Sequence, residues 1–128
     1  MQETENLIET LTLERLEMNL FRGVSPNDGF PRIFGGFVIA QALLAAYETV
    51  EDRICHSIHA YFIRPGDVTI PVIYEVDRSR DGGTFTTRRV IASQNGKQIF
   101  NLAASFQVVE EGMDYQSPMP AHPTAESV

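Results

Sequence analysis

The chain has 128 residues, which fits one domain that is long enough to bury a core. Its 43% hydrophobic and 21% charged residues are ordinary for a globular protein, and its formal net charge of −7 argues against nucleic-acid binding. The acidic N-terminus lacks the basic segment of a signal peptide, and the longest apolar run, residues 34–47, is too short to span a bilayer. A single cysteine, Cys55, excludes an internal disulfide and predicts a reducing compartment, the cytoplasm.

The first third of the chain predicts a helix, a strand and a loop. Leu7, Ile8 and Leu11 share one face of a helix over residues 3–11. Apolar and polar residues alternate over residues 16–21, which indicates a first strand. Turn-forming residues dominate 23–32, which we therefore expect to be a loop.

The next segment predicts one long helix over residues 35–51, opened by Gly35 and Gly36. Its residues are apolar almost all round, and Gln41 is the one polar interruption before Tyr47. A surface helix carries only one apolar stripe, so a helix of this kind is expected to be surrounded by protein.

The remaining ordered part predicts four strands in hairpin-like succession. Pro71 places the second of them at an edge or makes it distorted, because proline cannot donate to a strand ladder. Asn95-Gly96 is the strongest hairpin turn, because both residues tolerate positive φ. The four strands cover residues 56–64, 68–78, 84–94 and 97–108.

The last strand has one apolar and one mixed face. The even positions from Phe100 to Val108 are all apolar, while the odd positions from Asn101 to Gln107 are small or polar. A proline-containing tail follows. We therefore predict one domain over residues 1–113 and a linker or tail over 114–128 that leads to a further segment.

These elements predict an α+β fold with an antiparallel sheet of five or six strands. One long buried helix wrapped by such a sheet is typical of a hotdog fold.

Gly35-Gly36 is the first candidate site, for substrate binding. Free N–H groups and the positive end of the helix dipole suit an anion or a polarised carbonyl. The alternative is that the two glycines only allow a tight turn from loop to helix.

The histidines do not predict a metal site. His56 and His59 are three apart on a strand, so they point to opposite faces unless a bulge intervenes. His59 shares a face with Ser57 and Tyr61, and this face is the better polar candidate for substrate binding. A hydrogen-bonding structural role for the histidine is the alternative.

Gln107 and the arginines are the remaining candidates. A glutamine can orient a water or donate to an oxyanion, or it can simply be an exposed strand residue. Half of the ten basic residues lie between Arg64 and Arg89, so a local site for a phosphate-bearing ligand is expected there, with Arg64 and Arg88 as candidates. The alternative is that these charges only solvate a face.

Together these residues resemble the N-terminal half of the acyl-CoA thioesterase II, or TesB-like, family. The resemblance covers about residues 6–123 of this chain. Its motifs include Phe34-Gly35-Gly36, Arg80-Asp81-Gly82, Ala104-Ser105-Phe106-Gln107 and the specific stretch His56-Ser57-Ile58-His59-Ala60-Tyr61-Phe62.

The resemblance implies a double hotdog that hydrolyses fatty acyl-CoA to free fatty acid and CoA without a metal or redox cofactor. In that family an Asp, a Ser or Thr, and a Gln hold the attacking water. Gln107 matches the Gln position and Ser57 falls near the Ser or Thr position. Residues 34–50 contain no Asp, so we expect the catalytic Asp on an absent C-terminal hotdog half and little activity from this half alone.

Two other functions remain open. The chain could be a non-catalytic module for acyl-CoA binding or dimerisation, or a hotdog hydratase or dehydratase. The second needs an acid/base pair near the helix, and the first turns of this helix lack a carboxylate. The expected partners are an acyl-CoA substrate and a second hotdog domain, either a C-terminal half or a second copy in a homodimer, with no nucleic acid.

Overall fold

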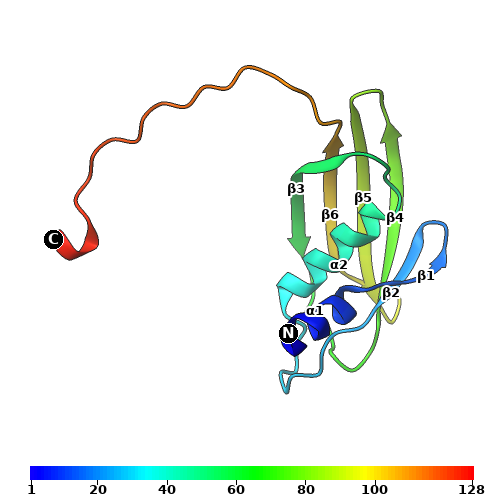
Figure 1. Ribbon diagram of the computed structural model, residues 1–128. Coiled ribbons are helices and arrows are strands. Elements are labelled where there is room, and N and C mark those ends of the chain that lie inside the picture. Colours follow the sequence, from blue (N-terminus) through cyan, green and yellow to red (C-terminus); the bar gives the residue numbers. More distant parts are fainter.

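The computed structural model describes the backbone of residues 1–128 and every side chain except that of Gln2. One long helix lies across one face of a six-stranded antiparallel sheet (Figure 1). The strand order in the sheet is β1-β2-β4-β5-β6-β3. This arrangement confirms the predicted α+β class and the predicted number of strands.

The N-terminal segment is more folded than its sequence pattern predicted. Helix α1 spans Gln2–Leu11, as expected. The single strand predicted over residues 16–21 is wrong, because the chain turns at Met18 and Asn19 and forms a hairpin of two short strands. These are β1 (Glu14–Glu17) and β2 (Leu20–Gly23), with Arg15 opposite Phe21.

Helix α2 (Gly35–Tyr47) is shorter and less enclosed than predicted. After Tyr47 the backbone continues in tight turns, with the N–H of Val50 donating to the Tyr47 carbonyl at 3.0 Å. The helix buries one side against the sheet, while Leu44 on the opposite side is 37% exposed. Among the described residues the helix is therefore covered by the sheet on one side and partly open on the other. The buried positions are Val38, Gln41, Ala42, Ala45 and Ala46.

The last three of the four long strands pair in succession as predicted, but the first does not pair with the second. Strand β3 (Ile54–Phe62) pairs only with β6 (Lys97–Gln107) and lies at the edge of the sheet. Strand β4 (Val72–Asp81) lies in the interior of the sheet, between β2 and β5. The edge position expected from Pro71 is therefore wrong. The strand starts after the proline, so no ladder hydrogen bond is lost.

The hairpin of β5 (Phe85–Gln94) and β6 confirms the prediction from Asn95-Gly96. Both turn residues have positive φ, 51° and 72°. Val90 and Leu102 are paired and buried toward α2, on what we call the inner face. The opposite, outer face of the sheet carries the alternating partners, such as Arg89 and Ala103.

The core lies between the inner face and α2. It is apolar apart from a few buried polar side chains. Its main members are Phe21, Val38, Ala42, Ala45, Val72, Tyr74, Val90, Phe100, Leu102 and Phe106.

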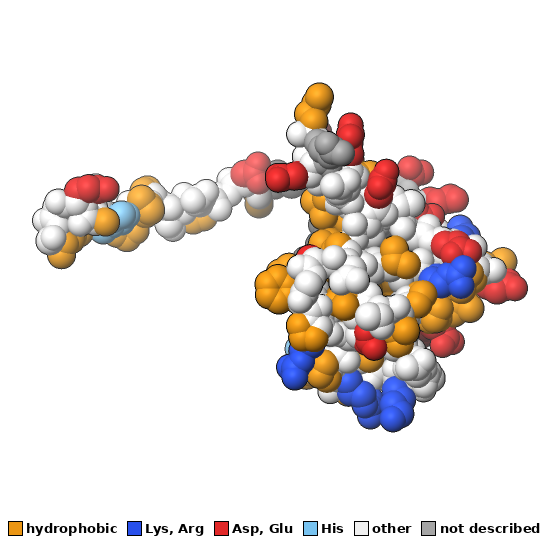
Figure 2. All heavy atoms as spheres, turned by 90° about the horizontal axis from the view of Figure 1, so that it is seen from below, with side chains coloured by type: hydrophobic (Ala, Val, Ile, Leu, Met, Phe, Trp, Pro, Cys, Tyr) orange, Lys and Arg blue, Asp and Glu red, His pale blue; other side chains and the backbone are white. Residues whose placement is uncertain are grey.

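Beyond β6 the chain runs as an exposed, extended tail that ends in a short 3-10 turn, η1 (Ala125–Ser127). The tail stands away from the domain body in both views (Figures 1 and 2). No helix among the described residues is long and apolar enough to cross a bilayer.

Candidate functional site

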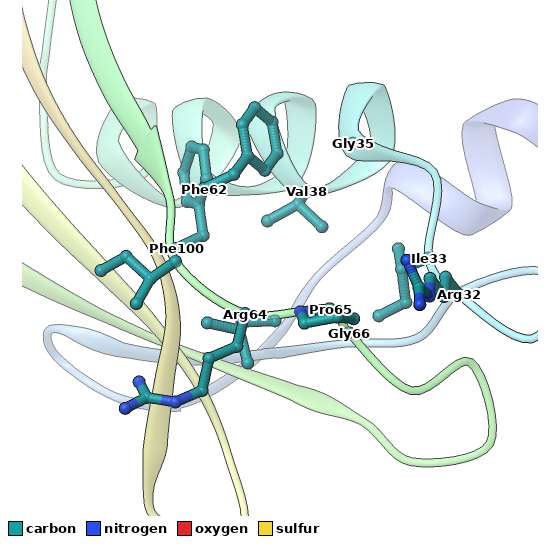
Figure 3. A pocket seen from close by; sticks show the side chains of 11 residues that line it. Arg32, Ile33, Gly35, Val38, Phe62, Arg64, Pro65, Gly66 and Phe100 are labelled. Carbon is teal, nitrogen blue, oxygen red and sulfur yellow. The ribbon is translucent and has the colours of Figure 1, made fainter.

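A cavity of about 320 Å³ opens at the N-terminal end of α2 (Figure 3). Three segments converge on it: the loop before α2, the first turns of α2, and the end of β3 with the start of β6. The residues that line it are Arg32, Ile33, Gly35, Val38, Phe62, Ile63, Arg64, Pro65, Gly66, Ile99 and Phe100.

The helix start offers the polar groups of this cavity. No side chain caps α2, and the N–H of Phe37 is bonded to the Phe34 carbonyl at 3.0 Å. For the N–H groups of Gly35 and Gly36 no partner is found among the described residues. The first N–H groups of a helix carry its positive dipole end. They therefore suit a carbonyl oxygen or an anion.

The rim of the cavity is held by the turn after β3. The N–H of Ile33 donates to the Gly66 carbonyl at 2.9 Å, and Arg32 forms a β-bridge with Asp67. Hydrogen bonds from the hydroxyl and N–H of Thr69 lower the pKa of Asp67 and fold this turn. These contacts fix the loop that leads into Gly35.

The rest of the cavity wall is apolar. Val38, Phe62 and Phe100 form it, with the two phenyl rings 5.0 Å apart. The guanidinium groups of Arg32 and Arg64 lie at opposite sides in Figure 3, and Arg64 donates to the Gln98 carbonyl at 2.6 Å. The lining includes no carboxylate and no imidazole. The cavity can bind a carbonyl beside an apolar chain, but it contains no group that could act as a general base.

The structure divides the predicted site residues into three groups. Gly35, Gly36 and Arg64 lie at this end of α2. Ser57, His59, Tyr61 and Gln107 lie on the outer face of the sheet, where Ser57 pairs with Ser105 and His59 with Ala103. Arg88 is buried on the inner face, near the C-terminal end of α2.

Gln107 is also far from the cavity along the sheet. It lies opposite Ile54, whereas Phe62 of the cavity is eight residues further along β3. Because the register there includes one bulge, this corresponds to seven strand rises, roughly 23 Å. Ser57 and Gln107 therefore cannot act on a carbonyl bound at Gly35 of the same domain.

A bulge between Cys55 and Ser57 corrects the prediction for the histidines. The extra residue turns His56 to the outer face, where its Nε2 lies 2.7 Å from Ser105 Oγ and its ring packs near Phe85. His56 and His59 thus share a face. Even so, no group of three or more His, Cys, Asp or Glu side chains in the described part of the chain is arranged to hold a metal.

Arg88 does not have the surroundings expected of a ligand-binding arginine. It is 1% exposed, and all five of its N–H groups are bonded within the chain. Its partners are Thr49, Asp81 and the carbonyls of Arg80 and Thr87. With no donor left for a phosphate, Arg88 is a structural residue here. The exposed neighbour, Arg89, faces outward.

Gln41 belongs to no predicted site, yet it fixes the segments that lead into the cavity. It is 1% exposed, and its Nε2 donates to the carbonyls of Thr10 at 2.7 Å and Val24 at 2.9 Å. Its Oε1 accepts from the Tyr74 hydroxyl at 2.7 Å. A single amide inside an otherwise apolar helix was the available signal, because a buried polar group must find partners.

Comparison with known proteins places the chain in a family. The profile described as "Acyl-CoA thioesterase N-terminal domain" matches residues 25–107. The chain belongs to this family. The matched range includes α2 with its start at Gly35-Gly36, the residues that line the cavity, and all four long strands.

Two curated relatives illustrate the similarity of this acyl-CoA thioesterase N-terminal domain. It is 48% identical over 116 residues to acyl-CoA thioesterase 2 of Haemophilus influenzae, covering 90% of this chain and 41% of that protein. It is 45% identical over 120 residues to human acyl-coenzyme A thioesterase 8, covering 92% of this chain and 38% of that protein. The chain thus spans about two fifths of the length of these relatives.

Solved structures of similar proteins have the same fold as this chain. The tesB protein of Mycobacterium avium subspecies paratuberculosis has a TM-score of 0.84 at 42% identity, covering 96% of this chain and 49% of that one. A protein from Alicyclobacillus acidocaldarius described as having a hot dog fold has a TM-score of 0.76 at 20% identity. The match covers 94% of this chain and 47% of that one. The predicted hotdog fold is thereby confirmed.

Proposed function

We propose that this domain binds fatty acyl-CoA and takes part in its hydrolysis to free fatty acid and CoA. The observation that carries the proposal is the cavity at the start of α2, which Gly35 lines beside an apolar wall, with no partner found for the N–H groups of Gly35 and Gly36 among the described residues. The N–H groups of Gly35 and Gly36 would polarise the thioester carbonyl, and the wall around Phe62 would hold the start of the acyl chain. The family of the domain supports the choice of a thioester.

The attacking water needs a base, and the cavity lining offers none. We therefore propose that the carboxylate comes from a second hotdog domain. If no second domain supplies one, the chain is an acyl-CoA-binding module without turnover, which is the second candidate function.

Turnover of a medium-chain acyl-CoA, followed with a thiol reagent, tests whether the base comes from a second domain. We expect the purified chain to bind the thioester but to turn it over at least about 100-fold more slowly than the full-length Haemophilus influenzae relative, because a missing general base typically costs this much. Equal turnover by the chain alone would show that it contains a complete site.

Gly35→Ala tests the carbonyl site itself. A Cβ at this position would lie 3.0 Å from the ring of Phe62, which is 59% exposed and able to move. We expect stability to change little, whereas affinity for a thioester analogue falls about tenfold, because the added methyl group would keep the carbonyl from approaching the N–H that alanine retains. Calorimetric titration measures the affinity. Gly83→Ala is the matched control, because its Cβ would meet nothing within 4 Å.

We also propose Ser57, His59, Tyr61 and Gln107 as groups of a site that a second domain completes. What supports this is their shared outer face and exposure of the first three. His59 and Tyr61 pack edge to face at 4.8 Å, which holds both rings in place. In an assembly that turns over substrate, Gln107→Ala should abolish activity. An unchanged rate would remove Gln107 from the site.

A homodimer is the assembly we propose for the chain on its own. Strand β3 pairs on one side only, and its exposed apolar side chains flank the open edge. Such an edge readily pairs with another strand. Size-exclusion chromatography with light scattering should give a dimer at micromolar concentration. Ile58→Lys should shift it to monomer, because a charge blocks edge pairing.

Ile8→Lys is the control for this experiment. Ile8 is 61% exposed on α1, which packs against α2, so its replacement should leave the dimer intact. A wild-type chain that stays monomeric at these concentrations would contradict the homodimer.

We further propose that residues 1–113 form the hotdog domain and that 114–128 act as a linker. The exposed, extended backbone of the tail supports this division. For the setting we propose fatty-acid metabolism in the cytoplasm, which agrees with the free thiol of Cys55.

A further inference from the structure

A second, larger cavity lies at the opposite end of α2. Its volume is about 520 Å³. The strands continue past the C-terminal end of the helix (Figure 1). The residues that line the cavity come from β1, β4, β5 and the connection from α2 to β3.

The floor of this cavity is unusual for the inner face of a sheet, because it carries arginines. Arg15 lies opposite the core residue Phe21 and over its ring, 5.2 Å from the centroid. Arg78 lies two residues beyond the buried Val76, on the same face. Arg88 is buried beneath them. The structure thus gathers three arginines where apolar side chains normally pack.

Arg88 and Asp81 neutralise each other through a hydrogen bond of 2.6 Å. The other arginines keep free donors. Arg78 uses only Nε, toward Asn19 at 2.7 Å, and Arg15 uses only one Nη, toward the Met18 carbonyl. Arg53 on the wall donates from one Nη to the Thr86 hydroxyl and from the other to the Gly83 carbonyl.

The wall adds two carboxylates. Glu48 and Glu51 line the cavity, and for their carboxylates no hydrogen bond or ion pair is found among the described residues. Once Arg88 and Asp81 are paired, three arginines face two glutamates. Guanidinium groups bind phosphate oxygens and stack on planar rings. Carboxylates accept hydrogen bonds from ribose hydroxyls.

We propose that this cavity binds a phosphorylated nucleoside, with Arg15 and Arg78 on the phosphate and Glu48 or Glu51 on the sugar. The mixture of charges fits a nucleotide better than a polyanion, which the glutamates would repel. Its volume is sufficient for one small ligand.

The nucleotide end of acyl-CoA is one source of this chemistry, and in that form the inference rests on the proposed function. From Gly35 to Tyr47 helix α2 rises about 18 Å. The extended phosphopantetheine arm of CoA has a comparable length. Gly36, Leu44 and Glu48 are exposed at spacings of eight and four residues along one side of the helix, which runs from one cavity to the other.

Calorimetric titration of the purified chain tests the site with adenosine 3′,5′-bisphosphate, CoA and unphosphorylated adenosine. We expect the two phosphorylated compounds to bind at least about tenfold more tightly than adenosine, because each charge-assisted hydrogen bond contributes at least this factor. Arg78→Gln and Arg15→Gln should each weaken the bisphosphate about tenfold. Equal affinities of both variants and the wild type would overturn the proposal.

Arg89→Gln is the matched control. Arg89 lies next to Arg88 on β5 but faces outward, so its loss removes the same charge and leaves the cavity unchanged. If it weakens binding as much as Arg78→Gln, the attraction is a general charge effect and the site is refuted. Thermal unfolding of each variant identifies any loss of fold. If one of the two arginine variants does not fold, the other still tests the site.

The two proposals fail in different ways. An acyl-pantetheine, which lacks the nucleotide, should depend on Gly35 but not on Arg78. If the bisphosphate binds and the acyl-pantetheine does not, the nucleotide site at the C-terminal end of α2 is supported and the thioester site at Gly35 is refuted. If only the acyl-pantetheine binds, the thioester site is supported and the nucleotide site is refuted. Tighter binding of CoA than of the bisphosphate would identify CoA as the source, whereas equal binding would identify a free nucleotide.

Discussion

Replacing Arg88 by Met is expected to lower the free energy of unfolding by about 3 kcal/mol, because a buried charge network loses its centre. Five hydrogen bonds disappear, and the Thr49 hydroxyl and carbonyl are left without their partner in a buried position. The carboxylate of Asp81 is 61% exposed and regains water, which limits the loss. Urea denaturation measures the change.

Arg89→Met is the control for this experiment, with an expected change within about 0.5 kcal/mol, as for most surface positions. A similar loss for both variants would show that the effect belongs to strand β5 in general. It would contradict the structural role assigned to Arg88.

The same pair predicts how stability depends on pH. The hydrogen bond from Arg88 lowers the pKa of Asp81 below its ordinary value of 3.8. The folded state therefore binds fewer protons than the unfolded state in acid, so stability rises with pH there. This contribution is complete above the ordinary pKa and is lost as the pH falls through the lowered one. The stability difference between wild type and Asp81→Asn should accordingly shrink below about pH 4.

Gln41→Leu is expected to lower the free energy of unfolding by about 3 kcal/mol, which is the second large effect. The leucine has a similar size, but the carbonyls of Thr10 and Val24 and the Tyr74 hydroxyl lose their partner. Each buried polar group left without a hydrogen bond costs about 1–3 kcal/mol, and water can reach some of them. The loops that hold α1 and the start of α2 should also loosen, which hydrogen exchange detects.

Tyr74→Phe gives the matched comparison. It removes one of the three bonds of Gln41 and should cost about 1 kcal/mol. Because the two side chains are in contact, the double variant should be less destabilised than the sum of the single ones. Additive losses would show that the Gln41 amide and the tyrosine act independently. Gly23→Ala should also destabilise, because its Cβ would clash with Gln41 Oε1.

Much of the local structure followed from the sequence alone. The Asn95-Gly96 turn, the two faces of β6 and the glycine start of α2 depend on neighbours within a few residues, where periodicity and turn chemistry decide. The family followed from short motifs, which are recognised in the sequence without a structure.

The exceptions are residues whose environment is set by distant segments. A bulge at His56 places both histidines on one face, and the pairing of β3 with β6 puts β3 at the edge. The bulge leaves no periodic signal, because one inserted residue reverses the face of every side chain beyond it. The pairing leaves none either, because it joins segments that lie far apart in the chain.

The sequence by itself therefore determined an α+β hotdog domain of the acyl-CoA thioesterase family with a glycine-started helix. Only the tertiary structure decided what each charged or polar candidate does. It buried Arg88 in a closed network, separated Gln107 from Gly35, and gathered Arg15 and Arg78 beside an open cavity. The physical reason is that a side chain's role depends on the face it occupies and on its partners, and strand register between segments far apart in the chain sets both.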